Sequence, residues 1–319
     1  MAIADQRIDP LDVSLVYLQG RPAVLNRENS SGETSAAEKL IRTRHAEIRH
    51  LIFEACREGA YEHENELLSE LATFCKDKFL KLLALCKATL TRLEVSAEFC
   101  FGCSLNSTVD SQIRSLKGAF TKVTELSIEP DRHMDFERFK TQAVSSKKLG
   151  SFLRMFPHLT TLRFCVGKWV RWSNLDVLLA ACPRLEKLYV GTSTVEVETA
   201  LQNATAHPVR TLVFDFPEAE VPCDFSGLRK CQKTEYLLLR TGWRDELDDE
   251  ILQNCFRAMP CLRWLIVAMI HTDCSLVGYC GDPGSGKVEL KSHSYADPEL
   301  LAAAYPQLHS IFWTDILMK

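Results

Sequence analysis

One stretch of the chain matches a phosphate-binding motif. Gly281-Asp-Pro-Gly-Ser-Gly-Lys287 fits G-x-x-x-x-G-K, the loop whose backbone N–H groups cradle phosphates. The next residue is Val288, where that motif needs a Ser or Thr hydroxyl for magnesium, and residues 289–295 do not open a convincing helix. Only 32 residues follow Lys287, which is too few for the rest of a nucleotide-binding sheet. The context therefore favours a solvated turn, with a nucleotide-binding enzyme that uses Gly281–Lys287 as the alternative.

The cysteines offer a second kind of chemistry. Cys100-Phe-Gly-Cys103 is a lone C-x-x-C, whereas a structural zinc site needs four ligands. The other candidate ligands are dispersed: Cys75, Cys86 and His133, and in a second group His271, Cys274 and Cys280. Several cysteines fall on apolar helix faces, where Cys serves as a small hydrophobic residue. We expect reduced structural thiols, no metal and no cofactor.

Acidic residues gather at 245–250, in the run Asp-Glu-Leu-Asp-Asp-Glu. Such a run could supply paired catalytic acids. It immediately precedes an apolar helical pattern that starts at Ile251, and acids are favourable at the positive end of a helix dipole. Neither G-x-S-x-G nor H-E-x-x-H occurs, and no Cys/His pair has an ordering partner. We therefore predict a protein that is not an enzyme.

Composition indicates an ordinary soluble protein. The 319 residues are 46% hydrophobic and carry a net charge of −4, which gives no sign of nucleic-acid or membrane binding. The first residues lack the layout of a signal peptide, and no apolar run approaches the roughly 20 residues of a membrane span. Thirteen cysteines without a secretory signal favour a reducing compartment, so we expect a cytoplasmic or nuclear location.

The elements that would position any site come from a repeated pattern, L-x-x-L-x-L. It occurs nine times, as Ile48-Leu51-Phe53, Leu90-Leu93-Val95, Val123-Leu126-Ile128, Leu159-Leu162-Phe164, Leu185-Leu188-Val190, Val209-Leu212-Phe214, Thr234-Leu237-Leu239, Leu262-Leu265-Val267 and Leu308-Ile311-Trp313. Successive starts are 42, 33, 36, 26, 24, 25, 28 and 46 residues apart. The four central spacings match the 20–29-residue period of leucine-rich repeats, and the longer ones imply insertions.

A helix precedes each predicted strand. Residues 174–182 place Leu175, Leu178, Leu179 and Cys182 on one helical stripe, which Ser173 or Asn174 can cap and Pro183 ends. A proline stands one or two residues before five of the strands, at positions 157, 183, 208, 260 and 306. The last unit opens with Asp297-Pro298, a helix cap followed by a proline at the first helical position. The repeated unit is thus a helix, a turn and a short strand.

Stacking such units gives an α/β fold of the leucine-rich repeat solenoid class, a curved parallel sheet on the concave face with helices on the convex face. A non-repeating α/β domain and a doubly wound sheet are the alternatives, but the strands of a doubly wound sheet are near-continuous apolar runs, whereas these strands alternate. We expect residues 1–37 to form a poorly structured N-terminal segment and linker. Residues 38–319 would form the solenoid, with irregular first and last repeats.

Side chains alternate along a strand, so the residue between the last two apolar positions points out of the concave face. In chain order this row comprises Ile52, Glu94, Ser127, Arg163, Tyr189, Val213, Leu238, Ile266 and Phe312, and the neighbouring row adds Tyr236 and Trp264. The row turns apolar towards its end, and exposed apolar patches mark binding surfaces or surfaces covered by another segment. We predict protein binding at Tyr189, Val213, Tyr236, Leu238, Trp264, Ile266 and Phe312. The alternative is that the insertion 270–296 covers this face, and the loop from Gly167 to Trp172 is a second exposed candidate.

The phrase from Leu178 to Leu188, Leu-Leu-Ala-Ala-Cys-Pro-Arg-Leu-Glu-Lys-Leu, resembles the repeats of F-box/LRR proteins. Met259-Pro-Cys-Leu-Arg-Trp-Leu265 and Phe156-Pro-His-Leu-Thr-Thr-Leu162 repeat that likeness, which covers roughly residues 45–319. The resemblance implies a substrate-recognition subunit of a ubiquitin ligase, with a Skp-type adaptor and a cullin ligase as partners. Residues 1–47 depart from it, because they contain no recognisable F-box.

Overall fold

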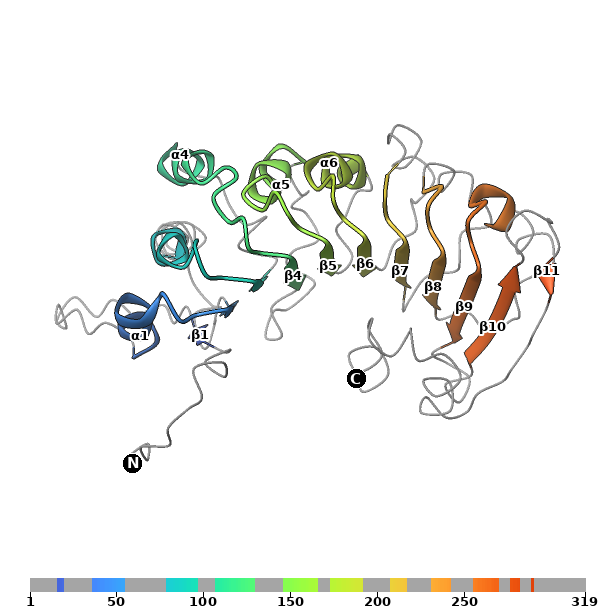
Figure 1. The fold of residues 1–319 in the computed structure, drawn as a ribbon, viewed down its shortest axis with the longest axis horizontal. Coiled ribbons are helices and arrows are strands. Elements are labelled where there is room, and N and C mark those ends of the chain that lie inside the picture. Colours follow the sequence, from blue (N-terminus) through green and yellow to red (C-terminus); the bar gives the residue numbers. More distant parts are fainter. Residues whose placement is uncertain are drawn as a thin grey trace, which may run out of the picture.

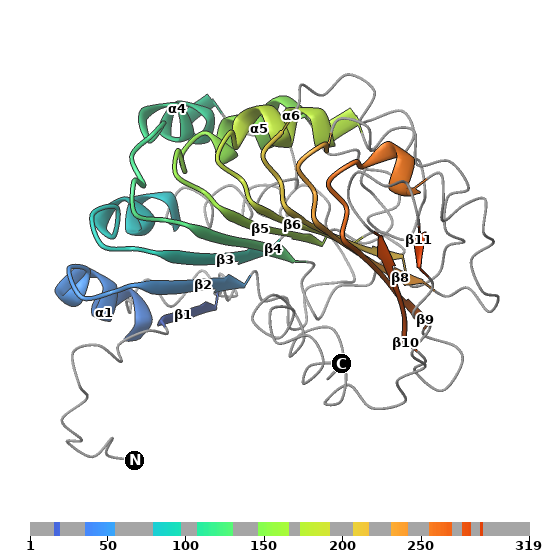
Figure 2. The same ribbon diagram turned by 45° about the vertical axis from the view of Figure 1, so that its right-hand side comes forward.

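The repeats form one curved sheet. The computed structural model describes residues 16–19, 36–54, 79–96, 107–129, 146–165, 173–191, 207–216, 231–241, 255–269, 276–281 and 288–289. Within these residues, eleven strands lie side by side in chain order. Strands β1 to β9 are parallel, and β10 and β11 continue the sheet in antiparallel pairing. The ribbon is an arc with the helices on its outer side and the sheet on its inner, concave side (Figure 1 and Figure 2).

The strands are short and similar in length, as expected for repeated units. They are β1 (Val16–Gln19), β2 (His50–Glu54), β3 (Arg92–Ser96), β4 (Glu125–Glu129), β5 (Thr161–Cys165), β6 (Lys187–Gly191), β7 (Thr211–Phe216), β8 (Tyr236–Thr241), β9 (Trp264–Met269), β10 (Leu276–Gly281) and β11 (Val288–Glu289). Eight of the nine predicted strands correspond to β2 through β9. The ninth, at 308–313, lies outside the described residues, as does the helix start at Asp297-Pro298.

The register confirms the repeat. The second leucine of each pattern is the partner of the same leucine in the next strand, which gives a continuous leucine row: Leu51, Leu93, Leu126, Leu162, Leu188, Leu212, Leu237 and Leu265. Every member of the leucine row is buried. Because a shift of one residue would turn all of these side chains to the other face, the pattern of the sequence fixes the register.

Hydrogen bonds at the start of each strand link one repeat to the next. The carbonyl oxygen of Arg49 accepts bonds from the N–H groups of Thr91 (2.8 Å) and Arg92 (3.0 Å). The same pair of hydrogen bonds, from two successive N–H groups to one carbonyl oxygen, recurs in six more places. The accepting carbonyls are those of Thr91, Thr124, Thr160, Glu186, Arg210 and Glu235. Each of these strands therefore begins at the same position relative to the strand of the preceding repeat.

Helices cover the outer side of the sheet in the N-terminal and central repeats (Figure 1). They are α1 (Ala36–Arg44), the helical residues 79–85, α4 (Ser107–Ser115), α5 (Ser146–Leu153), α6 (Ser173–Ala181) and the helical residues 255–258. In α6 the predicted stripe is confirmed, because Leu178, Leu179 and Cys182 are buried. Pro183 follows the helix at once, where its missing N–H ends the hydrogen-bond ladder.

Two glycines have separate roles, one in backbone conformation and one in helix packing. Gly118 ends the α4 turn with a φ of +69°, a left-handed conformation that favours glycine, and its N–H donates to the carbonyl of Arg154 at 2.9 Å. A Cβ atom at Gly150 in α5 would lie 2.8 Å from Cγ1 of Val177 in α6. The absence of a side chain at Gly150 therefore allows the close approach of α5 to α6.

Two buried polar side chains link repeats in the C-terminal part of the sheet. Thr234 occupies the first leucine position of its repeat, and its hydroxyl donates to the Val209 carbonyl at 3.1 Å. His207 places Nε2 3.1 Å from the Leu179 carbonyl and 3.0 Å from the Cys182 carbonyl, at the end of α6. Each side chain thus ties its repeat to the preceding one through backbone carbonyls, although Nδ1 of His207 is buried without a hydrogen-bond partner among the described residues.

The structure differs from the sequence-based expectation at both ends of the sheet. We predicted a poorly structured segment up to residue 37, but residues 16–19 form β1, where Val16 and Leu18 pair with Leu51 and Phe53. A four-residue apolar run is enough to add one strand to an existing edge. The alternative role of the insertion 270–296 was to cover the concave face, whereas its described parts, β10 and β11, extend the sheet from β9.

Candidate binding surface on the concave face

Two adjacent rows of side chains point out of the concave face. The middle row comprises Ile52, Glu94, Ser127, Arg163, Tyr189, Val213, Leu238 and Ile266, in register from β2 to β9. The first row comprises His50, Arg92, Glu125, Thr161, Lys187, Thr211, Tyr236 and Trp264. The sequence-based order of the candidate positions along the sheet is therefore found in the structure.

The N-terminal part of this face is a network of charges. His50 Nε2 lies 2.8 Å from Oε1 of Glu94, and Arg92 reaches the same oxygen at 2.9 Å. Arg92 also lies 3.8 Å from Glu125 on the next strand. Burial raises the pKa of the Glu94 carboxyl, but the bonds from His50 and Arg92 outweigh that effect and hold the pKa below its ordinary value. Glu94 is consequently ionised at neutral pH.

Arg163 stands where the charged part of the face meets the apolar part. Its Nε lies 3.0 Å from Oε1 of Glu129, which also accepts a bond from the Ser127 hydroxyl at 2.8 Å. The guanidinium carbon lies 4.5 Å from the centre of the Tyr189 ring, a cation–π geometry. Burial lowers the pKa of Arg163, while Cys165 and Glu129 raise it, and the net pKa exceeds the ordinary arginine value. The charge at this junction is therefore permanent and held in one position.

The C-terminal part of the face is apolar and only partly exposed. Tyr189 and Val213 form a small cluster with the partly buried Cys165 and Leu238. Tyr189 and Val213 are each 1% exposed, and Ile266 is 2% exposed. The expectation that these three side chains are exposed thus differs from the structure. Alternation along a strand determines which face a side chain occupies, but it does not determine whether that face is open to solvent.

Three predicted residues keep partial exposure and lie together. Tyr236 in β8 and Trp264 in β9 are register partners, and Leu238 lies two residues beyond Tyr236 on the same face. All three are neither fully buried nor fully exposed. Aromatic side chains of this type are enriched among the residues that dominate binding energy at protein interfaces. They form the apolar anchor of the candidate surface.

The remaining candidates fall outside the described residues. They are Phe312, the loop from Gly167 to Trp172, the acidic run 245–250 and the pair Cys100 and Cys103. Sequence reasoning also missed one group that the structure brings together, the contact of Glu129 with Arg163. Glu129 lies two residues beyond the middle row, so applying the alternation rule one step further along β4 would have placed it on the same face.

The glycine-rich motif lies in a context unlike that of a phosphate-binding loop. Gly281 ends β10 and Val288 begins β11, and the two residues are partners in an antiparallel pairing. The motif therefore connects two strands of a hairpin, whereas a phosphate-binding loop leads from a strand into a helix. Residues 282–287 themselves lie outside the described residues, and the placement of their two flanking strands favours the interpretation as a turn over a nucleotide site.

Four of the six described free cysteines behave as small hydrophobic residues. Cys86, Cys182, Cys231 and Cys255 are buried, and burial raises the pKa of the Cys86 thiol to about 11 and of the Cys182 thiol to about 12. Such thiols are poor nucleophiles and poor metal ligands. The part of the chain that the structure describes contains no cluster of three His, Cys, Asp or Glu side chains suited to a metal ion.

Comparisons with known proteins add little beyond the fold. No protein-family model matches the chain, and no curated protein matches it. Among solved structures, the leucine-rich repeat-containing protein LegL7 from Legionella pneumophila is similar over 90% of this chain and 96% of its own, with 13% identity and a TM-score of 0.40. The leucine-rich repeat class rests on the strand register described above and not on this similarity. Among the described helices, none is long and apolar enough to cross a membrane.

Proposed function

We propose that this protein is a non-enzymatic leucine-rich repeat scaffold that binds a protein on its concave face. The observation that carries the proposal is the change along one surface from a charged network at β2–β5 to the partly exposed group of Tyr236, Leu238 and Trp264 at β8 and β9. An apolar anchor beside fixed charges is the arrangement by which protein interfaces combine affinity with specificity.

The expected partner has a protruding apolar side chain flanked by charged groups. The apolar side chain would contact Tyr236 and Trp264, while an acidic group next to it would face Arg163. Tyr189, Val213 and Ile266 lie in the same row as Leu238 but are buried, so they would act as packing beside the contact residues. Phe312 stays a candidate contact on the basis of the sequence pattern alone.

A finer proposal is based on the resemblance to F-box/LRR proteins: the protein is a substrate-recognition subunit of a ubiquitin ligase in the cytoplasm or nucleus. The alternative is a leucine-rich repeat interaction protein unrelated to ubiquitin transfer. Co-purification with a Skp-type adaptor separates the two, because an F-box/LRR receptor must hold that adaptor. A full-length preparation that never retains the adaptor would favour the alternative.

Affinity purification with mass spectrometry tests the concave surface itself. The Tyr236→Ala/Trp264→Ala variant should lose proteins that the wild type retains, because truncating aromatic anchors typically costs about 2 kcal/mol or more each. Gln232→Ala/Lys233→Ala is the matched control, since both side chains are exposed and lie in the turn before β8, outside the two rows of the concave face. Equal losses in both variants, or a loss in neither, would contradict the proposed site.

A further inference from the structure

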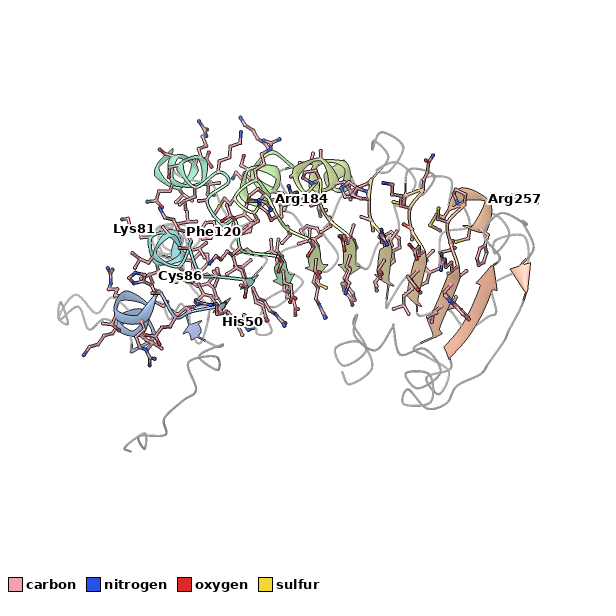
Figure 3. The ribbon with its side chains drawn as sticks, viewed as in Figure 1. His50, Lys81, Cys86, Phe120, Arg184 and Arg257 are labelled. Atoms are coloured by element: carbon pink, nitrogen blue, oxygen red, sulfur yellow. The ribbon has the colours of Figure 1, made fainter. Side chains whose placement is uncertain are left out.

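A second surface lies on the other side of the repeats. The stretches 79–91, 107–124 and 146–160, which precede β3, β4 and β5, contain eight lysines or arginines and one acidic residue, Asp110. Asp110 is half-buried in the first turn of α4, away from the strand starts. In Figure 3 the labelled Lys81 lies on the outer side of the arc, whereas Cys86 and Phe120 lie between helix and sheet. The local charge is thus strongly positive in a protein whose net charge is −4.

The cations collect where each helix turns towards its strand. We call Lys87, Arg114, Lys117, Lys122 and Arg154 the basic edge, and all five are exposed. Arg114 lies in the last turn of α4, while Lys87, Lys117 and Arg154 follow the helices of three consecutive repeats.

Backbone hydrogen bonds hold these turns against one another. The Gly118 N–H donates to the Arg154 carbonyl at 2.9 Å, and the Phe120 N–H donates to the Met155 carbonyl at 3.1 Å. The Thr124 N–H donates to the Thr91 carbonyl at 2.9 Å. These bonds fix the segments before β3, β4 and β5 against one another, so the basic edge follows the order of three successive repeats.

The cations of the basic edge differ from those of the C-terminal repeats in their pairing. At the strand starts of the C-terminal repeats, Glu235 lies 3.6 Å from Arg210 and 3.9 Å from Arg263, so an acid separates the two arginines. Among the described residues, no member of the basic edge has an ion-pair partner. The mutual repulsion of unpaired cations would be relieved by a bound anionic group.

We propose that the basic edge binds an acidic polypeptide segment. The phenylalanines of these stretches, Phe79, Phe120, Phe152 and Phe156, are buried, so these described stretches offer no phenylalanine platform for the bases of a single-stranded nucleic acid. Leu85 is the one large hydrophobic residue that is exposed among the described residues, which is too little apolar area for insertion into a membrane. Charge complementarity alone therefore selects the partner.

The dimensions of the strip fit an extended acidic chain. Neighbouring strands lie about 4.8 Å apart and packed helices about 8–10 Å apart, so cations of successive repeats are separated by distances in that range. In an extended polypeptide, side chains on one face recur about every 6.6–6.8 Å. Carboxylates at every second or third residue can thus meet Lys87, Lys117 or Lys122, and Arg154 in succession. This surface is distinct from the concave one, so its occupancy does not depend on the function proposed above.

The test is binding of a fluorescently labelled Glu/Gly peptide of about 15 residues to the full chain, followed by fluorescence anisotropy at about 50 mM and about 300 mM salt. A Gln/Gly peptide is the neutral comparison. We expect saturable, salt-sensitive binding of the acidic peptide only. Lys117→Glu/Lys122→Glu/Arg154→Glu should weaken it by at least ~10-fold, because three exposed ion pairs are replaced by repulsions.

The matched control is Arg210→Glu/Lys233→Glu/Arg263→Glu, which changes the net charge equally on the C-terminal repeats and should leave the affinity within about twofold. Lys117→Gln/Lys122→Gln/Arg154→Gln, checked by circular dichroism, covers the case in which charge reversal unfolds the chain. Equal losses in edge and control variants would overturn the proposal, as would no binding. Tighter edge-dependent binding of duplex DNA or of vesicles containing phosphatidylserine would overturn it as well.

Discussion

The two halves of the concave face share one register but differ in chemistry. From β2 to β5 the outward side chains form ion pairs, such as that of Glu94 with His50 and Arg92. From β6 to β9 they are mainly apolar, and Tyr189 and Val213 are buried. The core face does not change, because the leucine row runs unbroken through both halves. Repetition therefore constrains the core side of the sheet and leaves the other side free to differ from repeat to repeat.

Truncation of the leucine row should have the largest effect, and an equal one in both halves. Leu126→Ala and Leu212→Ala each remove a buried side chain, so each should lower the free energy of unfolding by ~2–5 kcal/mol. Urea unfolding followed by circular dichroism measures both values. A cost below ~1 kcal/mol in one half alone would show that the core row is not shared.

The second-largest loss of stability is expected when His207, which links the repeats of β6 and β7, is replaced. His207→Ala leaves the Leu179 and Cys182 carbonyls without this partner, at a cost of ~1–3 kcal/mol. Burial lowers the pKa of His207 from 6.5, although the two backbone bonds raise it in part. The unfolded chain therefore takes up a proton first, and stability should fall as the pH drops through the ordinary histidine range.

Thermal unfolding between pH 7.5 and 5.5 checks this dependence. His207→Gln retains a side-chain N–H donor and cannot titrate in this range, so its stability should vary less with pH than that of the wild type. An identical pH dependence in the two proteins would show that His207 does not contribute.

Thr234→Val should lower the free energy of unfolding by less, ~0.5–1.5 kcal/mol. Valine keeps the shape of the side chain, so only the hydrogen bond to the Val209 carbonyl is lost. Thr91→Val is the comparison in the N-terminal half, where the hydroxyl donates to the Arg49 carbonyl at 3.0 Å at an exposed position. The exposed substitution should have the smaller effect in chemical denaturation, since water replaces the lost donor. The reverse order would contradict the assignment of Thr234 as a buried tie between repeats.

Glu94→Gln should have the smallest effect and lower the free energy of unfolding by less than ~1 kcal/mol. The reason is that exposed and partly exposed ion pairs are screened by water. The pKa of Glu94 lies below its ordinary value of 4.5, so the carboxylate contributes stability above that pH. This contribution should disappear as the pH falls through the depressed pKa. Denaturation at pH 7 and pH 3 measures the difference, and a larger loss for the variant at pH 3 would have the wrong sign.

The repeat could be predicted from the sequence because the leucine pattern follows from the local geometry of strands and helices. Strand alternation and the helical stripe of Leu178, Leu179 and Cys182 depend on local geometry alone, and both are found. The edges of the sheet were not predictable in this way. Val16 and Leu18 form too short a run to register as a repeat, and the pairing of β10 with β9 depends on a tertiary edge that no local pattern encodes.

The candidate site could be placed from the sequence, but not its exposure. The order of Tyr189, Val213, Leu238 and Ile266 along the sheet follows from the repeat spacing. Burial depends on what lies against the face, which alternation does not describe. For the glycine-rich stretch the sequence context already favoured a turn over a phosphate site, and the structure pairs its flanking residues Gly281 and Val288 on antiparallel strands.

Hydrogen exchange at single-residue resolution tests the in-register array most directly. Seven consecutive strands, β3 to β9, begin with two N–H groups that donate to one carbonyl of the preceding repeat. We therefore expect slow exchange at both positions in all seven, including the exposed residues Thr91, Thr124 and Arg263. Rapid, solvent-like exchange at these paired positions in two or more of the seven strands would contradict the account of a continuous array of parallel repeats.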